Sequence, residues 1–450
     1  MKNCYLFGAG QLGIKAYNRF KDLYNILGFI DNDINKQGQI FINDIKCISI
    51  NDLDFSNVNY SIIITTDNFI DIKKQLDTLC YHDYLYANCL EHSSLAIDGV
   101  YYEDKTLCRK IDSASINLWI KLQSIKIDKN SSSEYFYNYL TKNTSFTHIS
   151  CDFGRIIYNV LSNKPDVNSI LDYGGGVGLL SLLAAECGIK NVYYNDSRAA
   201  ETVYEDEVIK FLSALNGEVK GFLFGDLPEV IATCKANCLR FDAIISYDVL
   251  EHIYDLRAFF INLPEILEHN AIIFMETGAS QYYREYYHHI NIRHLQYEFL
   301  PVFIDKNDKL IEIAHTPFFD IRYNIIKEYI ARHDLSFNEI ECLGISHITM
   351  GMNKEDIEYT ISRYVNRGQL PDKDPFSDFK YNTCNPLNGY WEEHIIDFDK
   401  FEEILKSMSY EVEVRYSFNN VKEISPIIQV FLLYKGRNNE NLLLHNGALT

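Results

Sequence analysis

Two kinds of hydrophobic pattern alternate along this chain. Short apolar runs that fit buried strands end in glycine-rich or acidic turns, and these lead into stretches with the 3.6-residue spacing of amphipathic helices. The alternation predicts βαβ units, and therefore an α/β protein built on parallel sheets. Strands are expected at 4–7, 26–30 and 61–65 in a first sheet, and at 169–171, 191–194, 219–224, 241–247, 266–276, 410–416 and 427–434 in a second. One more strand is expected at 84–90.

The same patterns divide the 450 residues into domains. We expect a front domain, a helical connector, a core that a large and mostly helical insertion interrupts after its fifth strand, and a tail. The respective boundaries are 1–95, 96–165, 166–278 continued by 391–437, 279–390 for the insertion, and 438–450 for the tail.

Helices are expected between and after these strands. The connector should hold helices at 113–127 and 146–161, separated by a flexible turn at 128–134, and the insertion should hold helices at 321–332 and 354–365. Asn353 should cap the second of these, and Asp399 with Glu402 should form a capping box at the start of a late core helix. Arg155, within the connector, is expected on the solvated surface.

The core begins with an acid and glycines between a strand and a helix. Asp172 ends the strand, and the loop carries Gly174, Gly175, Gly176 and Gly178. Glycines here leave bare backbone that a ligand can approach closely. The acid suits a cationic or hydroxylated ligand better than a pyrophosphate, which it would repel.

Further acids follow the later strands. Asp196 ends the second strand, Asp226-Leu227 follows the third, and Tyr247-Asp248 ends the fourth, within Asp248-Val-Leu-Glu251-His252. Together with the glycine loop, this pattern resembles motifs I to IV of class I S-adenosylmethionine (SAM)-dependent methyltransferases of the small-molecule type. The resemblance implies a seven-stranded Rossmann-like core with SAM as cofactor. It also implies that the glycine loop passes under the methionine part, Asp196 binds the ribose hydroxyls, and Asp226 and Leu227 meet the adenine.

The front domain has its own glycine loop. Gly8, Gly10 and Gly13 lie between a strand and a helix, and Asp31 ends the next strand. This Rossmann-like beginning resembles the front domains of sugar acetyltransferases, which bind nucleotide-sugars, so these four residues are a candidate nucleotide site. The alternative is a degenerate Rossmann domain retained for packing or dimerisation, and a homo-oligomer is compatible with it.

Composition and charge limit the classes of partner that we expect this protein to bind. A formal net charge of −20 disfavours nucleic acid, because phosphate contacts need Lys and Arg. No apolar run reaches about 18 residues, so no membrane span is expected. The start of the chain runs directly into a strand without a signal-peptide layout, and 11 scattered Cys fit a reducing cytoplasm.

The insertion lies at the carboxyl edge of the sheet, where ligands bind in open α/β folds, so it should cover the substrate. His288 or His289 could remove the acceptor's proton, and Arg284 or Arg293 could bind an acidic part of the substrate. Rival bases are Asp248, Glu251 and His252; Asp248 and His252 would share one face if their stretch were helical. His288, His289, His294 and Glu285 match no known metal-site spacing, so no metal is predicted.

The sequence therefore predicts a cytoplasmic methyltransferase acting on a hydroxyl, or an amine, of a small polar metabolite. A sugar or nucleotide-linked sugar is favoured through the resemblance of the front domain. A SAM-binding scaffold without catalysis and a protein methyltransferase remain the alternatives.

Overall fold

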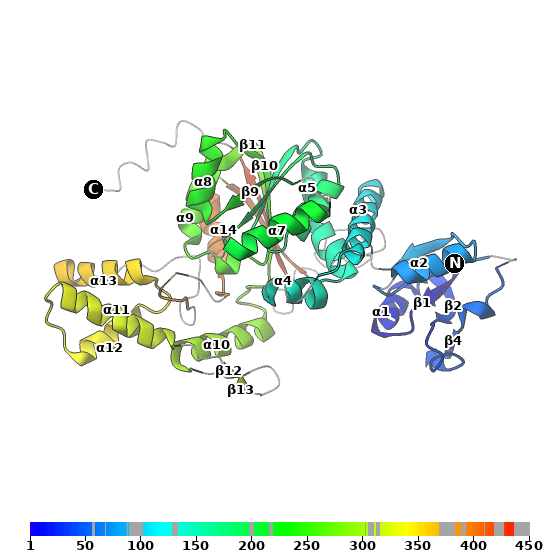
Figure 1. Ribbon diagram of the computed structural model, residues 1–450, viewed down its shortest axis with the longest axis horizontal. Coiled ribbons are helices and arrows are strands. Elements are labelled where there is room, and N and C mark those ends of the chain that lie inside the picture. The colour runs from blue at the N-terminus through cyan, green and yellow to red at the C-terminus, as the bar shows by residue number, and fades with distance from the viewer. Residues whose placement is uncertain are drawn as a thin grey trace. The chain divides into compact units, whose positions relative to one another are not determined.

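The structure is a computed structural model. It describes residues 1–55, 59–67, 69–87, 89, 102–127, 134–197, 202–215, 219–301, 303–304, 310–311, 316–368, 383–387, 389, 393–408, 410–417 and 427–435. The fold is mixed α/β and contains two mostly parallel sheets, as expected (Figure 1). The proposed tail and most of the predicted turn at 128–134 lie outside the described residues.

The front sheet has the strand order β3-β4-β2-β1-β5-β6. Its central strand β1 pairs in parallel with β2 and β5, which places the buried side chains of Leu6, Phe29 and Ile63 in one core. The strands are β1 (Lys2–Phe7), β2 (Tyr24–Ile30), β3 (Ile40–Ile42), β4 (Ile45–Ile48), β5 (Tyr60–Ile64) and β6 (Tyr84–Tyr86), and the helices are α1 (Gln11–Phe20) and α2 (Phe69–Thr78).

Two of these strands were not expected. Strands β3 and β4 form an antiparallel hairpin at the sheet edge. The turn between them uses Asn43 and Asp44, whose φ angles of 48° and 64° fit a tight two-residue hairpin turn. Strands this short carry too few residues to show an alternating pattern.

The connector differs from the prediction in two respects. Its first helix, α3 (Lys105–Ser124), begins eight residues before the predicted position, because the Asp104 side chain accepts hydrogen bonds from the backbone N–H groups of Thr106 and Leu107. Arg155, predicted on the surface, is fully buried and pairs with Asp152. The following elements are α4 (Glu134–Asn138), π-helical segments at Tyr139–Asn143 and His148–Phe153, and α5 (Gly154–Asn163).

The core sheet has the order β14-β15-β11-β10-β7-β8-β9. Strand β15 runs antiparallel to both β11 and β14, and β10 pairs in parallel with β7 and β11 (Figure 1). The strands are β7 (Ser169–Tyr173), β8 (Asn191–Asp196), β9 (Val219–Phe224), β10 (Phe241–Tyr247), β11 (Leu267–Thr277), β14 (Tyr410–Tyr416) and β15 (Ile428–Tyr434).

The core helices are α6 (Leu179–Glu186), α7 (Thr202–Ala214), α8 (Leu227–Ala236), α9 (Leu256–Asn262) and α14 (Phe398–Ser407). The predicted cap of the last helix was wrong by two residues. Asp397, not Asp399, is the N-cap, and its carboxylate accepts a hydrogen bond from the backbone N–H of Lys400.

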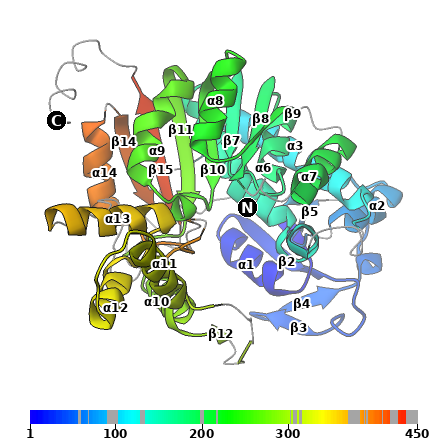
Figure 2. The ribbon, with the colours of Figure 1, turned by 60° about the vertical axis from the view of Figure 1, so that its left-hand side comes forward.

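The insertion forms a helical cluster (Figure 2). A buried ion pair links two of its helices: Arg322 on α11 binds Glu298 on α10 through both guanidinium NH2 groups, at 2.9 and 2.5 Å. Asn353 caps α13 as predicted. The helices are α10 (Arg284–Phe299), α11 (Phe318–Arg332), α12 (Glu339–Ile348) and α13 (Lys354–Arg367), with the short strands β12 (Phe303–Ile304) and β13 (Leu310–Ile311).

Candidate active site

The glycine loop of the core follows β7 and turns sharply. Gly174, Gly176 and Gly178 have φ angles of +71°, +55° and +83°, in the left-handed region that L side chains rarely adopt. At Gly174 a Cβ atom would lie 2.5 Å from the Val249 side chain. Glycine is therefore required at this position both for the backbone conformation and for the space.

An uncharged side chain holds this loop in place. Asn195, near the end of β8, is 1% exposed. Its Oδ1 accepts a hydrogen bond from the N–H of Gly174 at 3.3 Å, and its Nδ2 donates to the carbonyls of Leu223 and Gly225 at 2.7 and 2.9 Å. From β8, Asn195 thus links the turn that follows β7 to the end of β9 and the turn that follows it. The sequence did not indicate Asn195, because the recognisable motif points to the adjacent acid, Asp196.

The predicted acids gather at these strand ends. Asp172 and Asp196 are buried, and burial together with the charges of Glu229 and Asp196 raises the pKa of Asp226. Asp226 is also the N-cap of α8, yet its side chain accepts no capping hydrogen bond. Its carboxyl group is therefore placed at the helix start without being used to close the helix.

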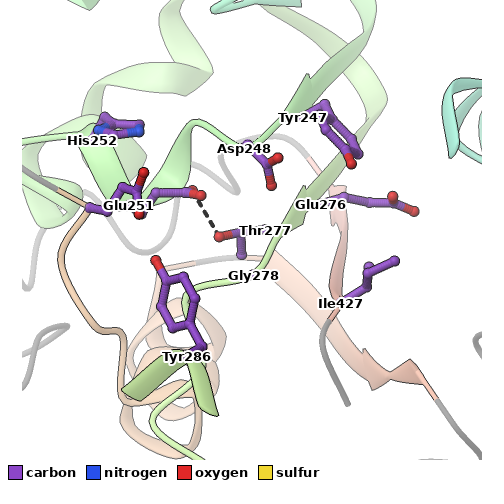
Figure 3. Close-up of a pocket in the computed structure, with 10 residues that line it drawn as sticks. Tyr247, Asp248, Glu251, His252, Glu276, Thr277, Gly278, Tyr286 and Ile427 are labelled. Carbon is purple, nitrogen blue, oxygen red and sulfur yellow. Dashed lines mark hydrogen bonds between the residues drawn. The ribbon is translucent and has the colours of Figure 1, made fainter. Parts of the chain in front are cut away.

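A cavity of about 250 Å³ lies beyond the ends of β10 and β11 (Figure 3). Four carboxylate residues contribute to its wall, and the remaining lining is mainly aromatic or hydroxylic. Its lining residues are Tyr247, Asp248, Glu251, His252, Glu276, Thr277, Gly278, Tyr286, Glu393 and Ile427.

Glu251 is the most perturbed acid of this cavity. Its side chain is buried and accepts a hydrogen bond from the hydroxyl of Thr277 at 2.8 Å. Burial, reinforced by the charge of Glu393, raises the pKa of Glu251 to about 7. A carboxyl group with such a pKa can both accept and release a proton near neutral pH.

A histidine fixes the backbone beneath this acid. The N–H and the Nδ1 of His394 both lie within hydrogen-bonding distance of the Glu251 carbonyl, at 2.9 and 2.6 Å. Burial, assisted by nearby His252 and His294, lowers the pKa of His394 to about 3. His394 is consequently neutral and holds the Glu251 backbone in position without adding charge.

Tyr286 reaches the cavity from the insertion. It lies on the first turn of α10, and its hydroxyl points toward the side that holds Glu251 and Thr277 (Figure 3). The hydroxyl oxygen is buried and has no hydrogen-bond partner among the residues that the structure describes. A buried phenol without a partner in a cavity wall is suited to binding a ligand.

The catalytic candidates from the sequence separate into two groups. Asp248 and His252 line the cavity, but not on an α-helix: Asp248 has a φ of +52°, and a 3₁₀ turn follows at Leu250–His252. His288 and His289 are exposed on α10 and do not line this cavity. Their proposed role as bases therefore gains no support from the geometry.

The two predicted substrate-binding arginines also lie outside the cavity lining. Arg284 is exposed, whereas Arg293 pairs with Glu393 at 3.4 Å. Of the cavity residues that the sequence did not indicate, Thr277 ends β11, Tyr286 lies on α10 and Glu393 follows the insertion. No local motif marks them.

The front glycine loop has a different internal arrangement. The carboxylate of Asp31 accepts hydrogen bonds from the N–H groups of Ala9 and Asp33, at 2.8 and 2.9 Å, and forms an ion pair with Lys36 at 2.9 Å. Gly8 has a φ of +123°, and Gly13 packs against the Gly8 carbonyl.

Two kinds of feature are absent from the described part of the chain. There, no three His, Cys, Asp or Glu side chains are grouped so that they could hold a metal ion. No helix in that part combines the length and the apolar character needed to cross a membrane.

Comparison with known families gives two matches. Residues 147–313 match the family described as a methyltransferase domain. This stretch of the chain is thus similar to methyltransferase domains. Residues 1–85 match a second family, described as C2185-like, N-terminal. No curated protein matches the chain.

Solved structures of methyltransferases resemble parts of this chain. A Streptococcus mutans protein assigned as a SAM-dependent methyltransferase is 14% identical over 28% of this chain and 35% of its own, with a TM-score of 0.22. The O-methyltransferase TomG from Streptomyces achromogenes, in complex with SAM, is 14% identical over 37% and 72%, with a TM-score of 0.26. The glycopeptide N-methyltransferase MtfA, complexed with sinefungin, is 9% identical over 62% and 92%, with a TM-score of 0.31.

The chain thus spans about a third of the length of the first of these structures. TM-scores of this size carry no argument on substrate or mechanism.

Proposed function

We propose that this protein transfers a methyl group from SAM to a hydroxyl or amine of a small polar metabolite, with Glu251 as general base. The observation that carries the proposal is the placement of Glu251. It is a buried carboxyl group with a pKa of about 7, in the wall of a cavity at the carboxyl edge of a methyltransferase sheet.

The residues at the strand ends fit SAM. The positive φ angles of Gly174, Gly176 and Gly178 require glycine and leave bare backbone that a ligand can approach closely. Asp196 would accept from the ribose hydroxyls, since a carboxylate can accept from both at once. Asp226 and Leu227 would meet the adenine, because the Asp226 carboxyl makes no capping bond to its own helix.

SAM, when bound, supplies a methyl group on a positively charged sulfur. Tyr247 and Asp248 end the strand beside the cavity and would hold the reacting end of the cofactor. Thr277 orients the Glu251 carboxylate through its hydrogen bond, and His394 fixes the Glu251 backbone. Alignment of the acceptor with the methyl carbon, rather than covalent chemistry by the protein, then supplies most of the rate enhancement.

The metabolite is proposed to be a sugar. This rests on the resemblance of the front domain to those of sugar acetyltransferases, with Gly8, Gly10, Gly13 and Asp31 as its nucleotide site. Since the same loop is closed by its own Asp31 and Lys36 contacts, packing or dimerisation is the competing role for this domain.

The test is a pH profile of methyl transfer. SAM carrying a labelled methyl group is supplied with panels of small hydroxyl and amine compounds, and formation of S-adenosylhomocysteine (SAH) is measured. The rate should rise as the pH passes through about 7, because Glu251 must lose its proton to act as base. Glu251→Gln should lower kcat by roughly 10²–10⁴-fold and remove the rise, with SAM affinity nearly unchanged.

Glu285→Gln is the matched control, because Glu285 is an exposed acid of α10 outside the cavity. Absence of SAM binding would overturn the whole proposal. A normal pH profile in Glu251→Gln would remove Glu251 as the base.

A further inference from the structure

We propose that the methyl acceptor is an amine, which enters the cavity as its ammonium ion and is recognised by Asp248, Glu251, Glu393 and Tyr286. The inference rests on the proposed function and specifies its substrate class. It concerns the residues that face the acceptor, not those that hold the cofactor.

The wall of the cavity is rich in acidic side chains. Asp248, Glu251, Glu276 and Glu393 line it, and no Lys or Arg is among the lining residues. Gln429 donates a hydrogen bond to Glu276 at 2.6 Å, which compensates part of that carboxylate. Arg293 Nη1 lies 3.5 and 3.4 Å from the two carboxylate oxygens of Glu393, a long ion pair that compensates only part of that charge. Such a wall favours a positively charged guest and disfavours a phosphate.

The fate of the positive charge of SAM differs between a hydroxyl and an amine acceptor. When a hydroxyl accepts the methyl group, the positive charge of the sulfonium disappears as the reaction proceeds. Carboxylates around the site would then stabilise the reactants more than the transition state and slow the transfer. An amine acceptor keeps the positive charge within the same cavity, from sulfur to nitrogen. The acidic side chains of the cavity therefore assist catalysis only when the acceptor is an amine.

The Tyr286 hydroxyl is a further feature of the cavity that fits an ammonium ion. It is buried, it points into the cavity, and it has no hydrogen-bond partner among the described residues (Figure 3). Burial raises the pKa of Tyr286 well above its usual value, and the charges of Glu251, Glu393 and Asp248 raise it further, so the phenol stays neutral. Its oxygen can accept a hydrogen bond from an ammonium N–H, which supplies the missing partner.

The proposed methyl transfer begins with the loss of a proton from the ammonium ion. The ammonium nitrogen gives one proton to the carboxylate of Glu251 and so exposes its lone pair. That lone pair forms the new N–C bond while the C–S bond breaks, and the bonding electrons remain on sulfur as SAH. The product leaves as a methylated ammonium, still neutralised by the wall, and Glu251 returns its proton to solvent.

A competing interpretation is that the acids serve only the sulfonium of SAM. Probes anchored in the cofactor site distinguish the two, because their arms extend past the methyl position into the cavity. We would use SAH analogues in which nitrogen replaces sulfur and carries a 2-aminoethyl, a 2-hydroxyethyl or a carboxymethyl arm. Calorimetry on the full chain gives their dissociation constants alongside that of SAH itself.

The aminoethyl probe should bind about tenfold more tightly than the hydroxyethyl probe, and the carboxymethyl probe most weakly. Glu393→Gln should reduce the amine preference to about threefold or less while leaving SAH affinity unchanged. Tyr286→Phe removes one oxygen with little change in shape and should reduce the preference part of the way. Glu285→Gln should leave it intact.

Equal binding of the amine and hydroxyl arms, or an undiminished preference in both variants, would overturn the amine inference while SAH binding keeps the proposed function standing. Failure of SAH to bind at all would overturn the proposed function itself. The unchanged SAH affinity in each variant also shows that the variant is folded.

Discussion

Two loops of this molecule follow the same sequence plan and are stabilised in different ways. Each joins the first strand of a parallel sheet to a helix through glycines, and each is followed by an acid at the end of the next strand, Asp31 or Asp196. In the front domain the acid itself closes the loop by accepting from the N–H of Ala9, with Lys36 balancing its charge. In the core the neighbouring amide of Asn195 does this by accepting from the N–H of Gly174.

The difference shows what spacing alone leaves undecided. The carboxylate of Asp31 already bonds to the protein's own loop. In the core Asn195 makes the corresponding bond, which leaves the carboxylate of Asp196 available to bind a ligand. The contacts of the front loop therefore favour the competing role of packing over the proposed nucleotide site, whereas those of the core loop fit the proposed SAM site. The substitutions below test this distinction from the largest expected effect to the smallest.

Gly13→Ala should have the largest effect. A Cβ atom at Gly13 would lie 2.0 Å from the carbonyl oxygen of Gly8, which is backbone and cannot rotate away. We expect a loss of about 3 kcal/mol in the free energy of unfolding of the front domain, measured by urea denaturation. Gly10→Ala is the matched control, because nothing lies within 4 Å of its Cβ position. Equal stabilities would show that the front loop is not close-packed.

Asp196→Ala should weaken SAM binding by roughly 100-fold, equivalent to about 2.7 kcal/mol, because it removes the carboxylate that we propose binds both ribose hydroxyls. Asp31→Ala should leave SAM affinity unchanged. Titration calorimetry of both variants provides the measurement. If Asp31→Ala lowered SAM affinity as strongly, the two loops would not have separate roles.

The sequence was informative where function depends on consecutive residues. The glycine loop and the acid Asp196 could be recognised because strand, turn and acid follow one another along the chain. The cavity could not be recognised in this way, since Tyr286 lies within the insertion and Glu393 follows it, and only the fold brings them to Glu251. Arg155 was placed wrongly because charge normally implies exposure, while here Asp152, three residues earlier, pairs with it in the interior.

Asn195→Ala should destabilise the core by about 2 kcal/mol. The substitution removes three hydrogen bonds and leaves the carbonyls of Leu223 and Gly225 without this donor. Chemical denaturation would be compared with Asn237→Ala, an exposed asparagine that bonds only within its own helix end. A loss no greater than that of the control would mean that other contacts hold the glycine loop.

Asp31→Asn should have the smallest effect, about 1 kcal/mol at neutral pH, and this effect should depend on pH. Burial opposes ionisation of Asp31, but hydrogen bonds from Asp33, Lys36 and Ala9 outweigh it and hold its pKa below the usual value. A carboxyl group with a depressed folded-state pKa contributes its stability above its unfolded pKa of about 3.9 and loses it as the pH falls through the folded value. Urea denaturation at pH 7 and at pH 3 should therefore show the difference between wild type and Asp31→Asn shrinking in acid. A difference that stayed constant would mean that the carboxylate charge does not close the front loop, and the contrast with the uncharged Asn195 would no longer hold.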